Sequence, residues 1–166
     1  MRVARRPALT LGLVASAALL QGCPSAYQRT YEQQTQRLEA QQRAIDAQEA
    51  TARAQAQQYA AVVYFEVGSA VVDVDGQREL RWFVQQMQPY PQATLDVQGF
   101  ADSTGSEATN ASLSQQRAAS VASYLASQGI APSRLVTTGF GTDSPAASNA
   151  TNQGRRNNRR VEVTVR

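Results

Sequence analysis

Three polar stretches in the second half of the chain decide how it folds. They are GFADSTG at residues 99–105, NASLSQQRA at residues 110–118 and GRRNNRRVE at residues 154–162. The first stretch leaves an alternating apolar segment typical of a strand, the second enters a helical pattern, and the third enters another alternating segment. The three stretches therefore stand where strands and helices begin or end, and packing does not explain their composition.

The segments around these stretches predict an α/β domain at residues 61–166. Apolar or alternating runs predict four strands, at residues 61–67, 94–99, 134–138 and 161–165. A polar loop is expected from Thr142 to about Asn158. The resulting order β-α-β-α-β-β predicts helices packed on one face of a mixed four-stranded sheet.

Apolar spacing places two helices in this domain. The first begins at Asp73 or Asp75, either of which could cap it, and runs to about Met87. The second begins after Asn110 or at Ser114, a plausible N-cap. It ends in a Schellman turn at Gly129-Ile130, because glycine tolerates the left-handed conformation that this turn requires.

Asp102 and Arg117 are the candidate binding residues. Asp102 stands at a strand end, where open α/β sheets present ligand groups. Arg117 is expected in the first turn of a helix, which favours an anion. Asp102 could pair with the ammonium of a zwitterion while Arg117 takes its carboxylate in a bidentate contact. The alternative is that the two side chains pair with each other, and spacing alone leaves both open.

The ordered motifs at residues 62–166 resemble the OmpA-like C-terminal domain, the peptidoglycan-binding module of peptidoglycan-associated lipoproteins. The matching residues are Asp102, Gly105, Asn110, Leu113-Ser114, Arg117-Ala118, Gly129-Ile130, Arg134, Gly139-Phe140-Gly141, Pro145, Asn149, Gly154-Arg155 and Asn158-Arg159-Arg160-Val161-Glu162. The resemblance implies the OmpA-like sandwich and a pocket for the diaminopimelate side group of the stem peptide.

The same resemblance assigns roles to individual residues. It implies that Asp102 takes the ammonium of diaminopimelate and Arg117 its carboxylate. Asn110 would support the pocket, and one of Arg159 and Arg160 would contribute. Strand alternation is expected to turn these two arginines to opposite faces.

The chain departs from the family pattern next to the key aspartate. The usual Gly-His-Thr-Asp is Gly99-Phe100-Ala101-Asp102 here. A ring nitrogen and a hydroxyl are lost, and any hydrogen bond that either makes is worth about 0.5–1.5 kcal/mol. An altered affinity or ligand preference is therefore expected.

The N-terminal segment, residues 1–22, is predicted to be a lipoprotein signal peptide. Three arginines precede an uncharged, mostly apolar run at residues 7–20, which is too short to span a bilayer of about 30 Å. The run ends in LQGC at residues 20–23, which resembles a bacterial lipobox. Cys23 is therefore expected to carry the lipid, including acyl chains such as palmitate. The alternative is an ordinary cleaved signal with an incidental cysteine.

Residues 23–60 are predicted to form a lipidated N-terminus and a spacer. From residue 26 on, Gln and Ala dominate, which favours a helix of about 52 Å if all of it is helical. One apolar row recurs every seven residues, at Tyr31, Leu38, Ile45, Ala52 and Tyr59, and the positions three further on are mostly Gln. A single row predicts at most weak self-association, and a disordered linker is the alternative.

Composition excludes several function classes. The chain of 166 residues has no His, no Lys and one Cys, which argues against Ser-His and Cys-His catalysis, nearly all zinc sites and internal disulfides. The net charge of +3 falls to zero without the three arginines of residues 1–22, which argues against nucleic-acid binding. A protein without enzymatic activity, cofactor or metal is expected.

Together these features predict an outer-membrane lipoprotein, anchored through Cys23 with its domain in the periplasm. Pro24 follows the cysteine where Asp would signal inner-membrane retention in enterobacteria, which favours the outer membrane by analogy. The predicted function is to tether that membrane to peptidoglycan by non-covalent binding. The alternative is a lipoprotein whose domain mainly binds another envelope protein, in which case Asp102→Ala would leave function intact.

Overall fold

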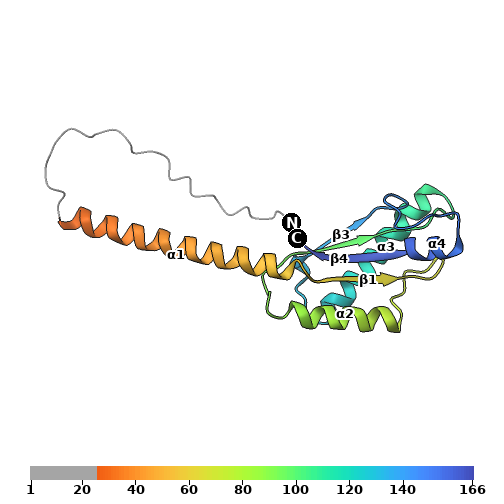
Figure 1. The fold of residues 1–166 in the computed structure, drawn as a ribbon, viewed down its shortest axis with the longest axis horizontal. Helices are drawn as coiled ribbons and strands as arrows, with labels where there is room; N and C mark the ends of the chain where they lie inside the picture. Colours follow the sequence, from red (N-terminus) through yellow and green to blue (C-terminus); the bar gives the residue numbers. More distant parts are fainter. Residues whose placement is uncertain (1–25) are drawn as a thin grey trace. The chain divides into compact units, whose positions relative to one another are not determined.

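The computed structural model describes residues 26–166 (Figure 1). The predicted signal peptide at residues 1–22 and the predicted lipidation site Cys23 lie outside the described residues. The predicted long polar helix is confirmed as α1 (Ala26–Ala56), and a compact unit begins at Ala44. Within the described part, no helix combines the length and the apolar character that a membrane crossing requires.

The compact unit contains a mixed sheet of four strands, as predicted. They are β1 (Ala60–Tyr64), β2 (Leu95–Gly99), β3 (Leu135–Gly139) and β4 (Arg160–Val165), in the spatial order β1-β4-β2-β3. Strand β4 pairs antiparallel with both β1 and β2, and β2 pairs parallel with β3. The C-terminal ends of β1 and β2 therefore lie beside the beginning of β4, at the same end of the sheet.

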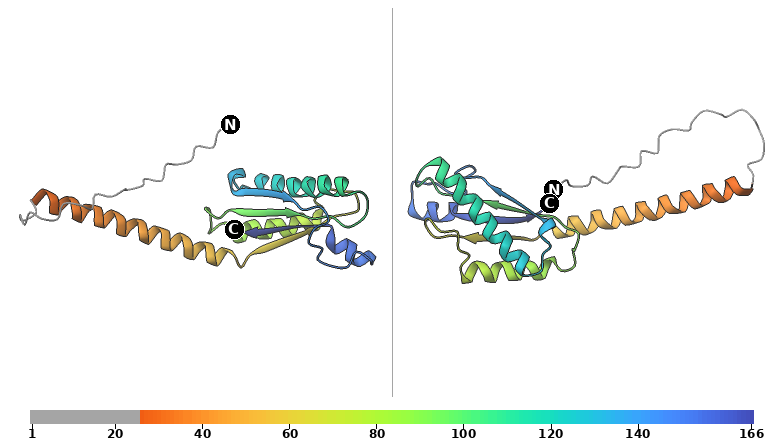
Figure 2. Two further views of the ribbon diagram at one scale, coloured as in Figure 1. Left: turned by 90° about the horizontal axis from the view of Figure 1, so that it is seen from above. Right: turned by 180° about the vertical axis from the view of Figure 1, so that it is seen from behind.

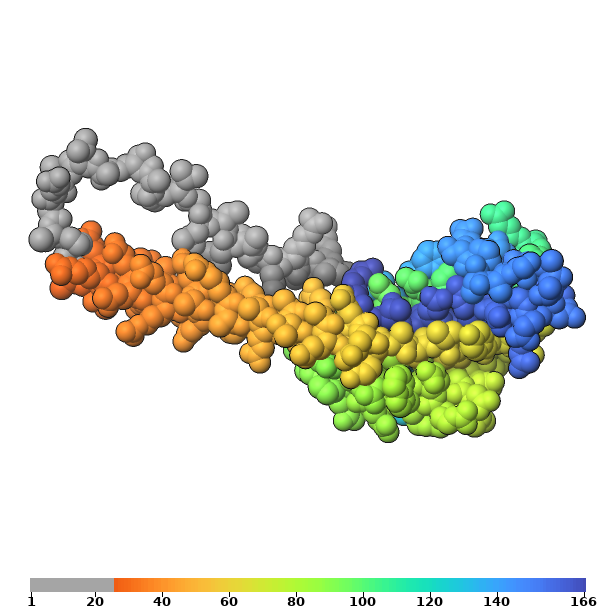
Figure 3. All heavy atoms as spheres, viewed as in Figure 1, coloured from red at the N-terminus to blue at the C-terminus, as the bar shows by residue number. Residues whose placement is uncertain are grey.

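Helices α2 (Val74–Met87) and α3 (Glu107–Ser127) share one core with the sheet. Alternation turns the apolar side chains of three strands to the same face, where helix residues cover them. The main contributors are Ala61, Val63, Leu95, Val97, Val161 and Val163 from the strands and Leu80, Phe83, Met87, Val121 and Leu125 from the helices. Figure 2 shows α3 lying across this face, and Figure 3 shows α2 along β1.

Two helix ends are stabilised by hydrogen bonds between residues that are close in the sequence. The Asp73 side chain caps α2, as predicted, by accepting a hydrogen bond of 2.8 Å from the Gly76 N–H. The Schellman turn after α3 is also confirmed. The N–H groups of Gly129 and Ile130 donate to the carbonyls of Ala126 and Leu125, and Gly129 has a φ of 100°.

The predicted start of α3 is wrong. The helix begins at Glu107, and the Ser106 side chain caps it by accepting from the Thr109 N–H. Ser114 lies buried inside the helix, where its hydroxyl donates to the Ala111 carbonyl and accepts from the Gly141 N–H. Arg117 therefore lies about three turns into the helix, too far from its N-terminus for the helix dipole to favour an anion there.

The predicted loop at residues 142–158 contains a further helix, α4 (Asn152–Asn158). The Thr151 hydroxyl caps it by accepting from the Gly154 N–H at 3.0 Å. Asparagine and glycine disfavour helices locally, so the segment carried no helical signal. Residues Pro132–Arg134 form a short 3-10 helix before β3. Strand β1 ends at Tyr64, three residues earlier than predicted.

Candidate functional site

A small pocket of about 120 Å³ lies where the ends of β1 and β2 meet α3 and the beginning of β4. Four of the five predicted ligand-binding residues line it: Asp102, Asn110, Arg117 and Arg159. Apolar side chains of Val67, Ala101 and Leu113 complete part of the wall. The pocket lies at the carboxyl ends of β1 and β2, the position where open α/β sheets bind ligands.

Two glycines allow α3 to approach the strand ends closely. A Cβ atom at Gly99 would lie 2.1 Å from the Ser114 carbonyl oxygen, and one at Gly139 would lie 2.6 Å from the Gln115 nitrogen. No side chain fits at either distance. The contact brings the middle of α3 against β2 and β3 and so places Arg117 beside the end of β2.

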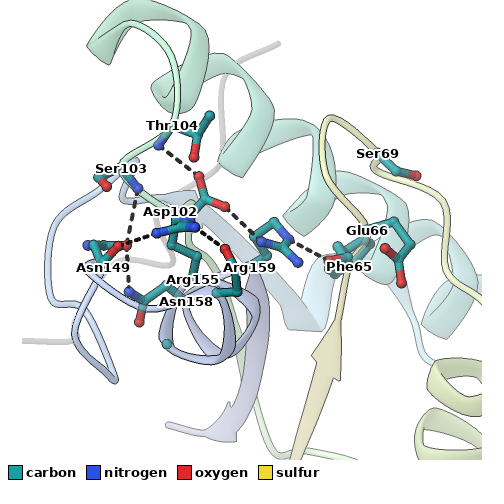
Figure 4. Close-up of polar contacts among 12 residues, drawn as sticks. Phe65, Glu66, Ser69, Asp102, Ser103, Thr104, Asn149, Arg155, Asn158 and Arg159 are labelled. Carbon is teal, nitrogen blue, oxygen red and sulfur yellow. Dashed lines mark hydrogen bonds and ion pairs between the residues drawn. The ribbon is translucent and has the colours of Figure 1, made fainter.

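Asp102 is buried and pairs with Arg159, not with Arg117. Its Oδ2 accepts from Arg159 Nη1 at 2.8 Å and its Oδ1 accepts from the Thr104 N–H at 2.8 Å (Figure 4). Burial raises the pKa of the Asp102 carboxyl, but hydrogen bonds from Arg159 and Thr104 outweigh it, so the pKa lies below its ordinary value. Asp102 is therefore a carboxylate at neutral pH.

Arg117 is fully buried and holds three backbone carbonyls. Nε donates to Ser69 at 2.8 Å, Nη1 to Phe100 at 3.1 Å and Nη2 to Glu66 at 3.1 Å. A guanidinium has five N–H groups, so one on each Nη is free of these bonds. Burial lowers the pKa of Arg117 to about 10, with a further lowering by the Arg159 cation that Asp102 partly offsets. The side chain therefore stays protonated at neutral pH.

Of the two neighbouring arginines, only Arg159 lines the pocket, and it precedes β4 as the C-cap of α4, so the alternation expected of a strand begins only at Arg160. Arg159 is buried at the pocket, where Nε also donates to the Phe65 carbonyl at 3.0 Å. The structure does not bring Arg160 to the pocket. Its Nε donates to Glu162 Oε1 at 2.6 Å, and its Cζ lies 4.0 Å from the centre of the Phe100 ring.

Sequence reasoning gave no role to the asparagines that support the Asp102 turn. Asn149 Oδ1 accepts from the Ser103 N–H at 3.2 Å and from Asn158 Nδ2 at 2.8 Å (Figure 4). Asn158, fully buried, also bonds both the N–H and the carbonyl of Ala147. Both asparagines belong to the matched motifs, but nothing in the motifs shows that they meet. Arg117 and Arg159 also donate hydrogen bonds to backbone carbonyls. Every residue type has a backbone carbonyl, so the sequence does not show which ones accept these bonds.

The site contains no evident metal centre. Across residues 26–166, no group of three or more His, Cys, Asp or Glu side chains is placed to hold a metal ion. The charged lining of the pocket consists of two arginines and one aspartate.

Comparison with known proteins agrees with this architecture. The chain is 44% identical over 103 residues to the probable lipoprotein YiaD of Escherichia coli, which is 62% of this chain and 47% of that protein. It is 49% identical over 75 residues to the peptidoglycan-binding protein ArfA of Mycobacterium tuberculosis, 45% of this chain and 23% of the relative. The chain thus spans about half or less of the length of these curated relatives.

A solved structure and a family model cover the same region. The crystal structure of the peptidoglycan-associated lipoprotein from Burkholderia pseudomallei superposes with a TM-score of 0.61 at 26% identity, over 64% of this chain and 90% of that one. The model of the OmpA family matches residues 64–159, which is more than half of the chain and includes every residue that lines the pocket. The chain therefore belongs to the OmpA family.

Proposed function

We propose that the domain binds the diaminopimelate side group of peptidoglycan without covalent chemistry. Its pocket is lined by two buried guanidinium groups and one buried carboxylate, so one positive charge has no counterpart there. Buried charges are costly unless they are paired, and an anionic group of a ligand would supply the missing partner. The guanidinium of Arg117, which hydrogen-bonds to carbonyls while Asp102 pairs with Arg159, is the observation that carries the proposal.

A zwitterionic amino-acid end fits the remaining bonding capacity. The Asp102 carboxylate accepts two hydrogen bonds and has lone pairs left for an ammonium. The two N–H groups of Arg117 that hold no carbonyl can donate to a carboxylate, and Asn110 on α3 adds an amide to the wall. The small volume of the pocket suits one end of diaminopimelate and leaves peptide and glycan outside.

The wider role is that of a tether between the outer membrane and the cell wall. Support comes from the resemblance of residues 20–23 to a lipobox, from the lipoprotein and peptidoglycan-binding names of the relatives, and from α1, whose 31 residues reach about 46 Å. Single contacts in the pocket are reversible. Many anchored copies that face one polymer would gain retention from effective concentration.

Binding of another envelope protein is the second candidate function. A separate hollow of about 430 Å³ lies between β1, the beginning of α2 and α4, away from Asp102. Strand β1 is an edge strand with the exposed side chains of Val62 and Tyr64, and such edges accept partner chains. A protein held there would not depend on Asp102.

Co-sedimentation with purified peptidoglycan sacculi tests the first proposal. The soluble chain of residues 24–166 is expected to pellet, and its Asp102→Asn variant is expected to stay in solution while its circular dichroism is unchanged. Asp96→Asn is the matched control, because Asp96 also pairs with an arginine, Arg166, but does not line the pocket. Equal pelleting of all three proteins would contradict the proposed site.

A further inference from the structure

We propose that Phe100 and Arg160 are positioning residues of the pocket, although neither lines it. The Phe100 ring, held between Phe140 and Arg160 on the far face of the sheet, fixes the backbone that presents Asp102 and holds Arg117. This inference rests on the proposed function and identifies what keeps the binding groups in place.

The first observation is that Phe100 is buried outside the main core. Only 4% of the residue is exposed, yet it does not belong to the apolar cluster under α2 and α3. Leu95 and Val97 point into that cluster, so alternation turns Phe100 to the opposite face. There its ring stacks on Phe140, with centroids 5.3 Å apart and planes 12° from parallel.

The second observation concerns the bonding of Arg160, which is 6% exposed. Nε donates to Glu162 and Nη2 to the Ser144 carbonyl at 3.3 Å, but within residues 26–166 the buried Nη1 has no hydrogen-bond partner. The guanidinium Cζ lies 4.0 Å from the Phe100 ring centre, a distance at which the negative face of the ring attracts the cation. Because β2 lies between β4 and β3, Phe100 lies between Arg160 and Phe140.

The third observation links this stack to the pocket through the backbone. The Phe100 N–H donates to the Arg160 carbonyl at 2.9 Å, and the Phe100 carbonyl accepts from Arg117 Nη1 at 3.1 Å. Asp102 follows two residues later. A ring that shifted would move the carbonyl that orients Arg117 and the turn that carries Asp102.

The stack also accounts for the departure from the family pattern at residues 100 and 101. A histidine and a threonine would bring polar groups that need partners when buried. Phe100 and Ala101 are buried apolar residues and need none. In this chain, the Phe100 ring fixes the segment through its contacts with Phe140 and Arg160.

The test uses Phe100→Leu in residues 24–166, with Phe83→Leu in the main core as the matched control. Each variant is titrated with meso-diaminopimelate by calorimetry at a temperature where circular dichroism shows it folded. Phe100→Leu is expected to raise the Kd about two- to tenfold, the range for loss of one aromatic contact. Phe83→Leu is expected to lower the Tm and leave the Kd unchanged. Arg160→Lys, which keeps the cation, should preserve more affinity than Arg160→Met.

The NMR resonance of the Arg117 Nε–H separates a positioning role from general destabilisation. It is expected to shift in Phe100→Leu and not in Phe83→Leu. If wild type binds diaminopimelate and Phe100→Leu binds it equally well, the inference is overturned. If wild type does not bind, the proposed ligand is wrong, and the resonance alone then decides: no shift in Phe100→Leu overturns the positioning role as well.

Discussion

Helices α1 and α3 are both long, at 31 and 21 residues, but different interactions stabilise each of them. Among the residues of α1 only Ala56 is buried, and the helix rests on the propensity of Gln and Ala and on local pairs such as Glu39–Arg43 at 3.2 Å. Helix α3 buries six residues, and three of them are the polar Asn110, Ser114 and Arg117. Ser114 and Arg117 therefore link α3 to backbone groups far away in the sequence, whereas the Glu39–Arg43 pair acts along α1 itself.

The largest expected difference between the two helices is the loss in the free energy of unfolding when one of their arginines is replaced by alanine. Arg117→Ala leaves the buried carbonyls of Glu66, Ser69 and Phe100 without a donor, so we expect the free energy of unfolding to fall by about 4 kcal/mol or more. Arg43→Ala on α1 removes only an exposed ion pair, worth about 0.5 kcal/mol or less. Urea denaturation of both variants measures the two effects. A small loss for Arg117→Ala would show that the carbonyl contacts are not needed.

Exchange of glycine and alanine should act differently in the two regions. Gly99→Ala places a Cβ against the Ser114 carbonyl and is expected to destabilise the domain by about 2–3 kcal/mol. The reverse change Ala47→Gly, in the exposed part of α1, should reduce helix stability by about 1 kcal/mol. Thermal unfolding reports the first effect and far-ultraviolet circular dichroism the second. An unchanged Tm for Gly99→Ala would contradict the close approach of α3.

Acid should destabilise the domain partly through Asp102. Its pKa is lower in the folded protein than the ordinary 3.8, so its contribution is fully present above that value and is lost as pH falls through the lower folded pKa. Urea midpoints between pH 7 and pH 2 should fall less steeply below pH 4 for Asp102→Asn than for wild type. Asp96→Asn provides the comparison. Parallel curves for wild type and Asp102→Asn would show that the Arg159 pair does not stabilise the folded state.

The smallest expected effect belongs to the exposed row on α1. Tyr31, Leu38 and Ile45 are 65%, 60% and 50% exposed and lie seven residues apart. We predict weak self-association through this row, which Leu38→Gln with Ile45→Gln should abolish while helicity is retained. Sedimentation equilibrium over a range of concentrations measures it. A wild-type chain that remains monomeric throughout would contradict the prediction.

Much of the fold was predictable because its signals are local. The Asp73 cap, the Gly129 turn and the alternation of β2 and β4 each depend on residues within a few positions of one another. The start of α3 was missed because Ser106 and Ser114 are both plausible caps, and only the contact of the Ser114 hydroxyl with Gly141 distinguishes them. Helix α4 was missed because its asparagines and glycine are poor helix formers.

The sequence by itself determined the family motifs, the succession of the four strands along the chain and the identity of Asp102 and Arg117 as candidate binding residues, whereas the order β1-β4-β2-β3 within the sheet came from the structure. Tertiary structure alone decided that Asp102 pairs with Arg159, that Arg117 holds three carbonyls, and that Arg160 turns to a separate aromatic stack. The physical reason is separation along the chain. Asp102 and Arg159 are 57 residues apart, and backbone acceptors have no residue type that a pattern could reveal.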